Sequence, residues 1–579
     1  MKLKIMALLV AMLAIVTALA SCKPSGGGGD DDGDKTPPKY SWGKTDILVQ
    51  LYENSNNGEL EPGLKRYCAG QDTAGTDEID SLVKDRNLKA YADANVSVKY
   101  NYEIGFGWGG STQDIQTLAT SGAATAPDIF ANFAYDMTSC ALRGCFANLL
   151  ANTDKTATTY GMGGNYFAFT KDDYVGINPD AYFDSNAGQG YFYDYMQSLA
   201  FVNENNEYDK MYCLASNYCV DAIRSFLVIP VNINMLESIS VEASTGDVNG
   251  DKAFDVEDFY SLVWDYKWTY DALATLSKSV YSPDNNADPN ADILDTLGIC
   301  LGNSSGLTAS GVLYTTSVGI IEKYQDSETG KWSYKYPETN NKLVALADAL
   351  TNLFKNNTGL ATLDSAQAKA AGLGDGSGEL AAIRSRFAQD KVLFGGIIAV
   401  GSLEDTVYQQ MNEPGKKGFG VVPIPLYTQS FDDAGNPSEV YQTLVHNLAR
   451  IFAISATTSK FDQCTAFLDY QSTNSKDILE MYYNQNLVAA VDAGKAATHN
   501  VNMLNYIRSH VRDCFDKTYE DVISNYQLTV DKEASSKRWH GIFSTNAYQV
   551  SNMAKRYAEE SPAKQTQLVT VLAEWAKLK

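Results

Sequence analysis

The stretch Asp46-Ile-Leu-Val-Gln-Leu-Tyr52 opens the series of elements that decides the fold. Its apolar residues are spaced as in a mostly buried strand. Helix-like spacing follows over residues 77–94, and Val96–Tyr102 alternates as a second strand. A short helix over Thr112–Ser121 and a third strand over Pro127–Ala131 complete the series. Strands and helices in this alternating order predict an α/β fold with a parallel sheet.

Polar and aromatic residues follow each of the three predicted strands. Ligands of parallel sheets gather at the carboxyl ends of the strands. Amide and aromatic side chains there can hydrogen-bond to a small polar ligand and stack on it. Each residue alone is compatible with ordinary loop chemistry, but three successive strand ends of this kind favour a ligand site. The candidate ligand-binding residues are Asn54, Trp108, Asn132, Phe133 and Tyr135.

The amino-terminal residues 1–22 have the layout of a signal peptide, with two early lysines and an apolar run from Ile5 to Ala20. That run is shorter than the roughly 20 residues of a membrane span. Leu19-Ala-Ser-Cys22 resembles the lipobox of bacterial lipoproteins, in which the cysteine takes a lipid. We therefore expect an extracytoplasmic protein that is lipid-anchored to the cell membrane through Cys22. Residues 23–39, rich in Gly and Asp, are expected to form a flexible linker; an ordinary signal ending in cysteine is the alternative.

The composition of the chain argues against nucleic acid and zinc as partners. The formal net charge of −24 argues against a nucleic-acid partner, because phosphate binding needs clustered Lys and Arg. Four scattered histidines and the lack of a Cys-x-x-Cys pair argue against zinc. Export permits disulfides, for which Cys140 with Cys145 and Cys213 with Cys219 are close enough in sequence. Cys464 lies in a helical apolar stripe, where a buried thiol is expected.

Several ordered motifs resemble those of the extracellular solute-binding proteins of ABC importers, in particular the sugar-binding group that includes maltose-binding proteins. They extend over most of the chain that follows the linker. The motifs are Ser121-Gly122 with Ala126–Ile129, Val231–Leu236, Lys267–Leu273, Phe387–Phe394, Gly420–Pro425, and Phe452–Lys460 with Ala466–Leu468.

The resemblance implies a two-lobed fold of the type II periplasmic-binding-protein class, with crossing hinge segments and a ligand cleft between the lobes. Residues 40–150 and 444–500 would form the first lobe. Residues 151–443 and 501–579 would form the second. A small solute, a sugar or oligosaccharide, would favour the closed state because only that state lets both lobes touch it. The membrane subunits of an importer would then recognise the closed form.

The resemblance also implies roles for single residues. Asn132 stands where a sugar-stacking tryptophan is common, with Phe133 and Tyr135 beside it. Trp539 stands where a late tryptophan stacks on the ligand from the second lobe, and Asn54 follows the first strand. The family's Gly-Pro-Trp ligand loop is replaced here by Ile397–Ser402. The sugar class therefore stays open, and peptides or other polar solutes remain alternatives.

Two acidic loops resemble the calcium loop of EF-hands, and more closely its Asp-terminated variant in dockerins. Their oxygen-bearing side chains recur at the spacing that Ca²⁺ prefers, and position 7 would give a backbone carbonyl. Position 6, normally glycine, is Lys252 in the first loop and Pro289 in the second. Lys252 can adopt the positive φ that the turn needs, whereas proline cannot. Two solvated turns are the alternative to structural calcium. The candidate ligands are Asp247, Asn249, Asp251, Ala253, Asp255 and Asp258 in loop 247–258, and Asp284, Asn286, Asp288, Asn290, Asp292 and Asp295 in loop 284–295.

Two other functions are alternatives to a transport-associated binding protein. A surface glycoside hydrolase would need a pair of carboxylates in a catalytic context, and none of the acidic pairs has one. His-Glu-x-x-His and phosphate-loop motifs are also absent. We therefore expect no enzyme activity. A surface glycan-binding adhesin or sensor is the second alternative.

Overall fold

The computed structural model describes residues 42–53, 65–70, 78–104, 110–150, 192–284, 291–302, 306–316, 318–356, 359–373, 378–446, 449–511, 519 and 552–579. Met1–Lys39 separates from Tyr40–Lys579, and every described residue belongs to the latter. The expected signal peptide, the linker and Cys22 therefore lie outside the described residues. Within the described ranges, no helix has both the length and the apolar character of a membrane span.

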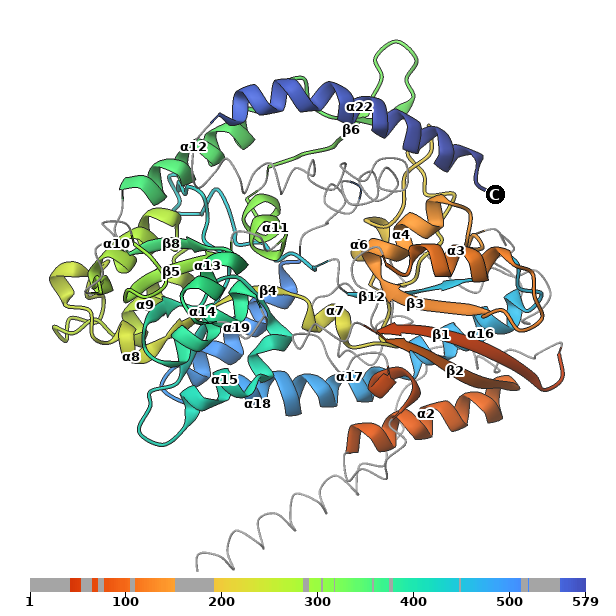
Figure 1. Ribbon diagram of the computed structural model, residues 1–579, viewed down its shortest axis with the longest axis horizontal. Coiled ribbons are helices and arrows are strands. Elements are labelled where there is room, and N and C mark those ends of the chain that lie inside the picture. The colour runs from red at the N-terminus through yellow and green to blue at the C-terminus, as the bar shows by residue number, and fades with distance from the viewer. Residues whose placement is uncertain are drawn as a thin grey trace, which may run out of the picture. The chain divides into compact units, whose positions relative to one another are not determined.

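The first lobe is built on the sheet that the opening stretch predicts (Figure 1). β1 (Thr45–Glu53) pairs in parallel with β2 (Val96–Ile104) along its whole length and with β3 (Ile129–Phe133) on its other side. β12 (Arg450–Ile454) returns from far along the chain and pairs antiparallel with β3, giving the order β12-β3-β1-β2. The parallel strands therefore end at one edge, where Phe133 and its neighbours lie.

Helices cover both faces of this sheet (Figure 1). Leu51 and Tyr52 point to opposite faces of β1 and are both buried, because both faces of the sheet are covered. The helices that pack together on one side are η1 (Lys65–Ala69), α2 (Glu78–Ala94), α16 (Phe461–Thr473) and α17 (Lys476–Tyr482). The helices that pack together on the other side are α3 (Thr112–Thr120) and α4 (Ala134–Leu142).

The second lobe has a mixed sheet of six strands. β5 pairs in parallel with β8 and β9, whereas β4 pairs antiparallel with β9, β10 and β11. The strands are β4 (Leu227–Asn232), β5 (Leu297–Gly302), β8 (Leu360–Leu363), β9 (Val392–Phe394), β10 (Ile398–Ala399) and β11 (Phe419–Val422). A separate hairpin consists of β6 (Glu322–Gln325) and β7 (Trp332–Lys335).

Short and long helices accompany this second sheet. The indole of Trp268 is fully buried among them and donates from Nε1 to the carbonyl of Pro423 at 2.9 Å. α10 lies so close to β5 that a Cβ at Gly298 would lie 2.0 Å from the Cβ of Ser277, so glycine is required there. The remaining helical elements are α6 (Tyr193–Gln197), α7 (Asp221–Arg224), α8 (Ile233–Leu236), η3 (Val241–Ala243), α9 (Val256–Trp264), α10 (Tyr270–Val280), α11 (Gly306–Tyr314), α12 (Asn341–Asn356), α13 (Ser365–Ala370), α14 (Glu379–Ala388), η4 (Val400–Glu404), α15 (Thr406–Gln409), η5 (Gln410–Asn412), η6 (Tyr483–Val488), α18 (Ala489–Val491), α19 (Ala497–Ser509) and α22 (Met553–Lys577).

The chain crosses between the two sheets more than once. Leu214 pairs with Phe452 of β12, and the chain then enters β4 at Leu227. Val445 pairs with Phe226 on the way back to β12. A third crossing runs from α17, which packs on α2, through η6 to α18 and α19, which pack on β11.

Two segments near these crossings contact a sheet far from them in sequence. Leu214 of the segment 211–214 pairs with Phe452 of the first sheet. The helix α19 packs on β11 of the second sheet, and Tyr260 Oη donates to Asn500 Oδ1 at 2.8 Å. The lobe ranges expected from the sequence, 40–150 with 444–500 and 151–443 with 501–579, stay predictions.

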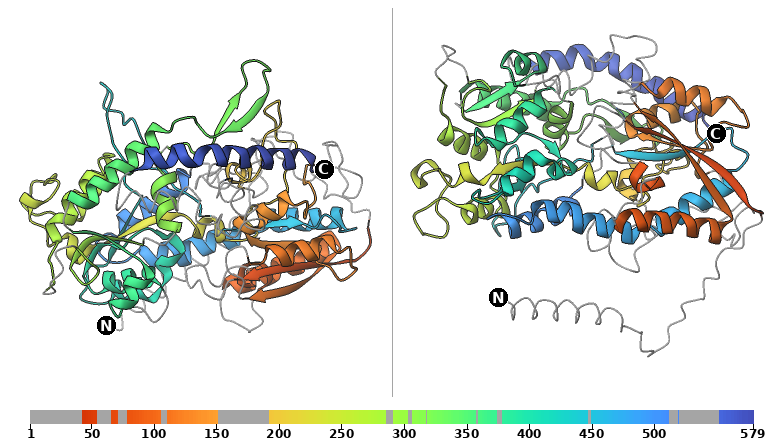
Figure 2. Two further views of the ribbon diagram at one scale, coloured as in Figure 1. Left: turned by 45° about the horizontal axis from the view of Figure 1, so that its top comes forward. Right: turned by 60° about the horizontal axis from the view of Figure 1, so that its bottom comes forward.

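The helix α22 contacts both lobes (Figure 2). It packs on α12 and β7 of the second lobe and on α4 of the first. It therefore forms a connection between the lobes that does not pass through the crossing segments.

Candidate functional site

A buried polar cluster lies where β3 ends and α4 begins. The Asn132 side-chain nitrogen donates to the Ser111 hydroxyl and, at 3.1 Å, to Oδ2 of Asp136. The Ser111 hydroxyl donates to the same carboxylate oxygen at 2.8 Å, and the Thr112 hydroxyl donates to Oδ1 at 3.3 Å. All four side chains are at most 5 % exposed. Burying a carboxylate is costly unless donors surround it, and here three side chains supply them.

A small apolar cluster adjoins this site and joins the two lobes. Phe133 and Tyr135 from the first lobe pack with Ala399 at the end of β10 in the second lobe, separate from the main core. Each of the two rings is 2 % exposed. The Arg450 guanidinium lies 5.0 Å from the centre of the Phe133 ring, close enough for a cation–π interaction. The site that the sequence places at the end of the third strand is thus a contact between lobes.

Buried charges hold the crossing segments beside this contact. Arg450 of β12 donates from Nη1 to Asp221 of α7 at 2.9 Å, and both side chains are at most 1 % exposed. Arg224 of the same helix lies 3.7 Å from Glu404 of η4, measured from Nε to Oε1. The Tyr482 hydroxyl donates to Glu404. One ionic network therefore connects β12, α7, η4 and α17.

The electrostatics of this network keep its cation charged. Burial alone would lower the pKa of Arg224, but the nearby Tyr482, Glu404, Tyr67 and Asp221 raise that pKa above its ordinary value. Burial raises the pKa of Tyr482 well above its ordinary value, against the opposing effect of Arg224. Tyr482 therefore remains a hydrogen-bond donor to Glu404.

The structure brings together three of the candidate ligand-binding residues. Asn132, Phe133 and Tyr135 lie in one buried region, but they are not at a loop tip as expected. β3 continues through Phe133 because β12 pairs with it there, and Tyr135 is in the first turn of α4. Asn54, Trp108 and Trp539 lie outside the described residues, so their roles stay predictions.

Sequence reasoning missed the carboxylate and the charges of this region. Asp136 closely follows the third predicted strand, and this position was a usable signal for a residue of a strand-end site. Asp221 and Arg450 carried no comparable signal, because their pairing joins segments separated by most of the second lobe. Such pairs are visible only once the chain is folded.

The acidic loop 247–258 has the backbone conformation that a calcium loop needs. Lys252 has φ of 70°, so it takes the left-handed turn normally reserved for glycine, as expected. Asp258 accepts the Val248 amide at 2.7 Å through Oδ1, and together with Asp255 it caps the start of α9. The carboxylate of Asp247 accepts backbone amides at 2.6 and 2.9 Å.

The side chains of this loop are turned onto its own backbone amides rather than onto a common point. Among the described residues, no three His, Cys, Asp or Glu side chains are grouped so that they could hold a metal ion. Calcium would therefore have to draw the oxygens of Asp247 and Asp251 away from amides that they now accept. Calcium binding stays a prediction.

The second acidic loop is described only at its two ends. Asp295 accepts the amide of Asp284 at 2.7 Å and that of Asp292 at 3.2 Å, which closes the loop. Asn286, Asp288 and Asn290 lie outside the described residues. The expected calcium site there stays a prediction.

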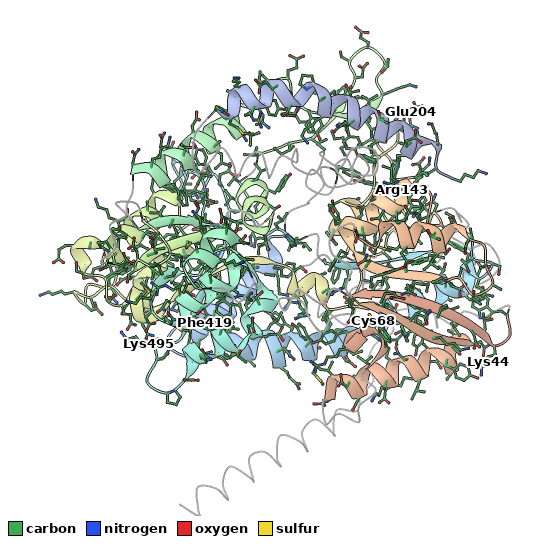
Figure 3. All side chains as sticks on the ribbon, in the orientation of Figure 1. Lys44, Cys68, Arg143, Glu204, Phe419 and Lys495 are labelled. Carbon is green, nitrogen blue, oxygen red and sulfur yellow. The ribbon has the colours of Figure 1, made fainter. Side chains whose placement is uncertain are left out.

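The seven described cysteines are buried and have free thiols. Cys140 and Cys145, one of the pairs close in sequence, lie side by side, and burial followed by the neighbouring Cys145 raises the pKa of Cys140. Cys219 lies beside Cys68 rather than beside Cys213. Figure 3 labels Cys68. Cys464 is fully buried, as its helical stripe predicts.

No protein-family model matches the sequence, and no curated protein matches it. Solved structures do resemble it. A galacto-N-biose- and lacto-N-biose-I-binding protein of an ABC transporter from Bifidobacterium longum aligns with 13% identity over 92% of this chain and 98% of its own, at a TM-score of 0.45. A maltose-binding periplasmic protein from Listeria monocytogenes has 15% identity, 90% and 99% coverage, and a TM-score of 0.42.

A maltose- and maltodextrin-binding domain from Bdellovibrio bacteriovorus aligns with 11% identity over 90% of this chain and 99% of its own, at a TM-score of 0.43. The sugars named for these proteins are their own ligands. This chain's own topology consists of a parallel sheet closed by one antiparallel returning strand, a second mixed sheet, and crossing segments between them. The chain therefore has a two-lobed α/β fold.

Proposed function

We propose that this chain is the membrane-anchored, extracytoplasmic substrate-binding component of an ABC importer, and that it captures a sugar or oligosaccharide by closing its lobes. The observation that carries the proposal is the contact of Phe133 and Tyr135 in the first lobe with Ala399 in the second. It lies at the carboxyl end of β3, where parallel sheets bind ligands. The aromatic faces there suit a molecule with C–H faces, and the polar group of Asn132, Ser111 and Asp136 lies beside them.

Hinge closure follows from this arrangement. A solute that touches both lobes binds their closed arrangement better than the open one, so it shifts the population toward closure. The ionic network of Arg224, Glu404, Asp221 and Arg450 lies on the crossing segments, where rotation must occur. Such a buried network gives the hinge a defined geometry. Anchoring through Cys22 would keep the binding protein near the importer's membrane subunits.

We propose binding rather than catalysis at this site. Asp136 accepts hydrogen bonds from Ser111, Thr112 and Asn132. Its oxygens are thus occupied by neighbouring side chains, so Asp136 fits a positioning role better than that of a general base.

A thermal-shift screen of the purified chain against mono-, di- and oligosaccharides tests the proposal, with peptides and other polar solutes beside them. A ligand at a hundred times its dissociation constant adds about 2.7 kcal/mol to the stability. At about 2–4 °C per kcal/mol for lobes of this size, the melting temperature should rise about 5–11 °C. A rise with peptides and none with carbohydrates would reject the sugar, and cleavage of a glycoside would reject a binding role.

We also propose that the loop 247–258 binds structural Ca²⁺. Asp247, Asn249, Asp251 and Asp258 would supply side-chain oxygens, Ala253 a carbonyl, and Asp255 a side chain at the ninth position. The positive φ of Lys252 supports the proposal, because the loop turns as a calcium loop does. The ion would stiffen the connection into α9. Loop 284–295 is a second candidate calcium site, because its oxygen-bearing side chains have the same spacing.

A further inference from the structure

The first part of α22 is fixed to the second lobe. The Tyr557 hydroxyl donates to the Pro337 carbonyl at 2.7 Å, and Tyr557 is 2 % exposed. Further along, the Gln565 side-chain oxygen accepts the backbone amide of Tyr336 at 2.8 Å. Both partners directly follow β7. This half of the helix therefore moves with the hairpin and α12.

The last turn of α22 is fixed to a different part of the chain. The Trp575 indole makes edge-to-face contacts with Phe201 and Tyr212, with ring centres 5.3 and 5.2 Å apart. The Lys210 ammonium donates to the carbonyls of Trp575 at 3.3 Å and Ala576 at 2.9 Å. A cation at these carbonyls also favours the negative end of the helix dipole.

The hairpin of β6 and β7 contacts the same group of aromatic side chains. Tyr334 of β7 places its ring 5.3 Å from that of Phe201, and its hydroxyl accepts the Val202 amide at 3.0 Å. We call Phe201, Tyr212, Tyr334 and Trp575 the aromatic joint. Aromatic pairs of this edge-to-face kind attract one another beyond the area that they bury.

The two sides of the aromatic joint belong to different lobes. Met211 accepts the Leu149 amide at 2.7 Å, and Leu214 pairs with Phe452 of β12, so Tyr212 lies on the first lobe. The first half of α22 lies on the second lobe through α12. The hairpin lies between the two sides, since the Trp332 amide donates to the Glu204 carbonyl at 2.9 Å. A rotation of one lobe against the other must therefore strain or open the aromatic joint.

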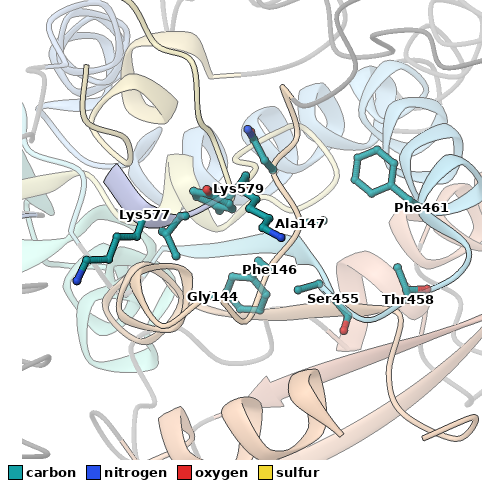
Figure 4. Close-up of a pocket in the computed structure, with 12 residues that line it drawn as sticks. Gly144, Phe146, Ala147, Ser455, Thr458, Phe461, Lys577 and Lys579 are labelled. Atoms are coloured by element: carbon teal, nitrogen blue, oxygen red, sulfur yellow. Dashed lines mark hydrogen bonds between the residues drawn. The ribbon is translucent and has the colours of Figure 1, made fainter. Parts of the chain in front are cut away.

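The surface that the last turn of α22 contacts is incompletely packed. The indole nitrogen of Trp575 is buried and finds no hydrogen-bond acceptor within the described ranges. A cavity of about 620 Å³ adjoins this end, lined by Phe146 and Phe461 of the first lobe and by Leu578 (Figure 4). If the last turn of α22 moved away, water could reach the indole nitrogen and accept its hydrogen bond. That hydrogen bond would offset part of the free energy lost when the aromatic contacts separate.

We propose that α22 is a strap and the aromatic joint its latch, which together hold the lobes in the described arrangement and set how readily they part. The inference rests on the proposed function only in requiring that the lobes move. The end at Trp575 releases, because it is the incompletely packed end. The end at Tyr557 stays attached.

Distances between spin labels test the latch without any ligand. Leu88→Cys on α2 and Thr275→Cys on α10 place exposed labels on the two lobes, and the described native cysteines are buried. Trp575→Ala removes the central ring of the joint. It should shift the ratio of longer to shorter distances at least about tenfold toward the longer ones. Val569→Ala changes an exposed residue of the same helix and should leave the distances unchanged.

Lys210→Met keeps the latch testable if Trp575→Ala does not fold, because it removes only the ammonium that caps the last turn. It should shift the distances in the same direction by a smaller factor. Distances equal to those of Val569→Ala in both variants would overturn the latch. A shift in distances together with a negative carbohydrate screen would leave the latch standing and reject the proposed function.

Discussion

The buried pair of Asp221 and Arg450 offers a sharp test of the hinge. Removing one partner, as in Asp221→Ala or Arg450→Met, leaves the other charge buried at 1 % exposure or less. An uncompensated buried charge costs about 3–5 kcal/mol. At about 2–4 °C per kcal/mol, either single variant should melt about 6–20 °C lower. Asp221→Ala should be the worse of the two, because Arg450→Met leaves Asp221 with Arg224, whose Nη1 lies 3.9 Å from Oδ1. Arg450→Met also loses the cation–π contact with Phe133, worth about 0.5–2 kcal/mol.

The double variant Asp221→Leu with Arg450→Met tests whether the buried charge causes the stability loss of the single variants. Replacing both members of a buried pair by apolar groups is often neutral, so the double variant should melt above either single one. Thermal unfolding followed by tryptophan fluorescence measures all three. Lys267→Met is the matched control, because its pair with Asp265 is exposed and should contribute little. Additive losses in the double variant would refute the reasoning, since they would show that packing, rather than charge, sets the cost.

Three further predictions concern the anchor, the metal and the ligand. Cys22→Ser should move the protein from the membrane fraction to the soluble fraction, and continued detergent-dependent association would contradict the lipid anchor. Ca²⁺ should raise the melting temperature, and Asp247→Ala with Asp251→Ala should remove most of that gain; identical melts with chelator and with millimolar-range calcium would reject the site. Trp539→Ala should weaken ligand binding at least about thirtyfold, which corresponds to about 2 kcal/mol, while the unliganded melting temperature barely changes. A much lower melt with normal binding would identify Trp539 as a core residue.

The strands and helices of the first lobe could be predicted because their signals are local. The three strands and the two helices between them appear within two residues of their expected ends. Lys267–Leu273 likewise contains the start of α10, where Thr269 caps the helix by accepting the Ala272 amide. Alternation, helical spacing and capping are properties of neighbouring residues, so one sequence is enough to find them.

The exact end of β3 could not be predicted. Asn132 and Phe133 look like loop residues after an apolar run, but Arg450 pairs with Phe133 and extends the strand. The same strand also pairs through Phe452 with Leu214, another contact that the sequence did not indicate. Both contacts join segments far apart in sequence, and such contacts leave no local pattern.

The placement of β12 also governs the order in which this chain can fold. Residues 450–454 complete the edge of a sheet whose other strands lie within the first 133 residues. Until they arrive, β3 is an open edge that can pair with another chain. Closing so long a loop is slow, because its entropy must be lost before the contact forms. An emerging chain therefore carries an aggregation-prone edge until most of the second lobe has been synthesised, and a chain cut before Arg450 keeps it.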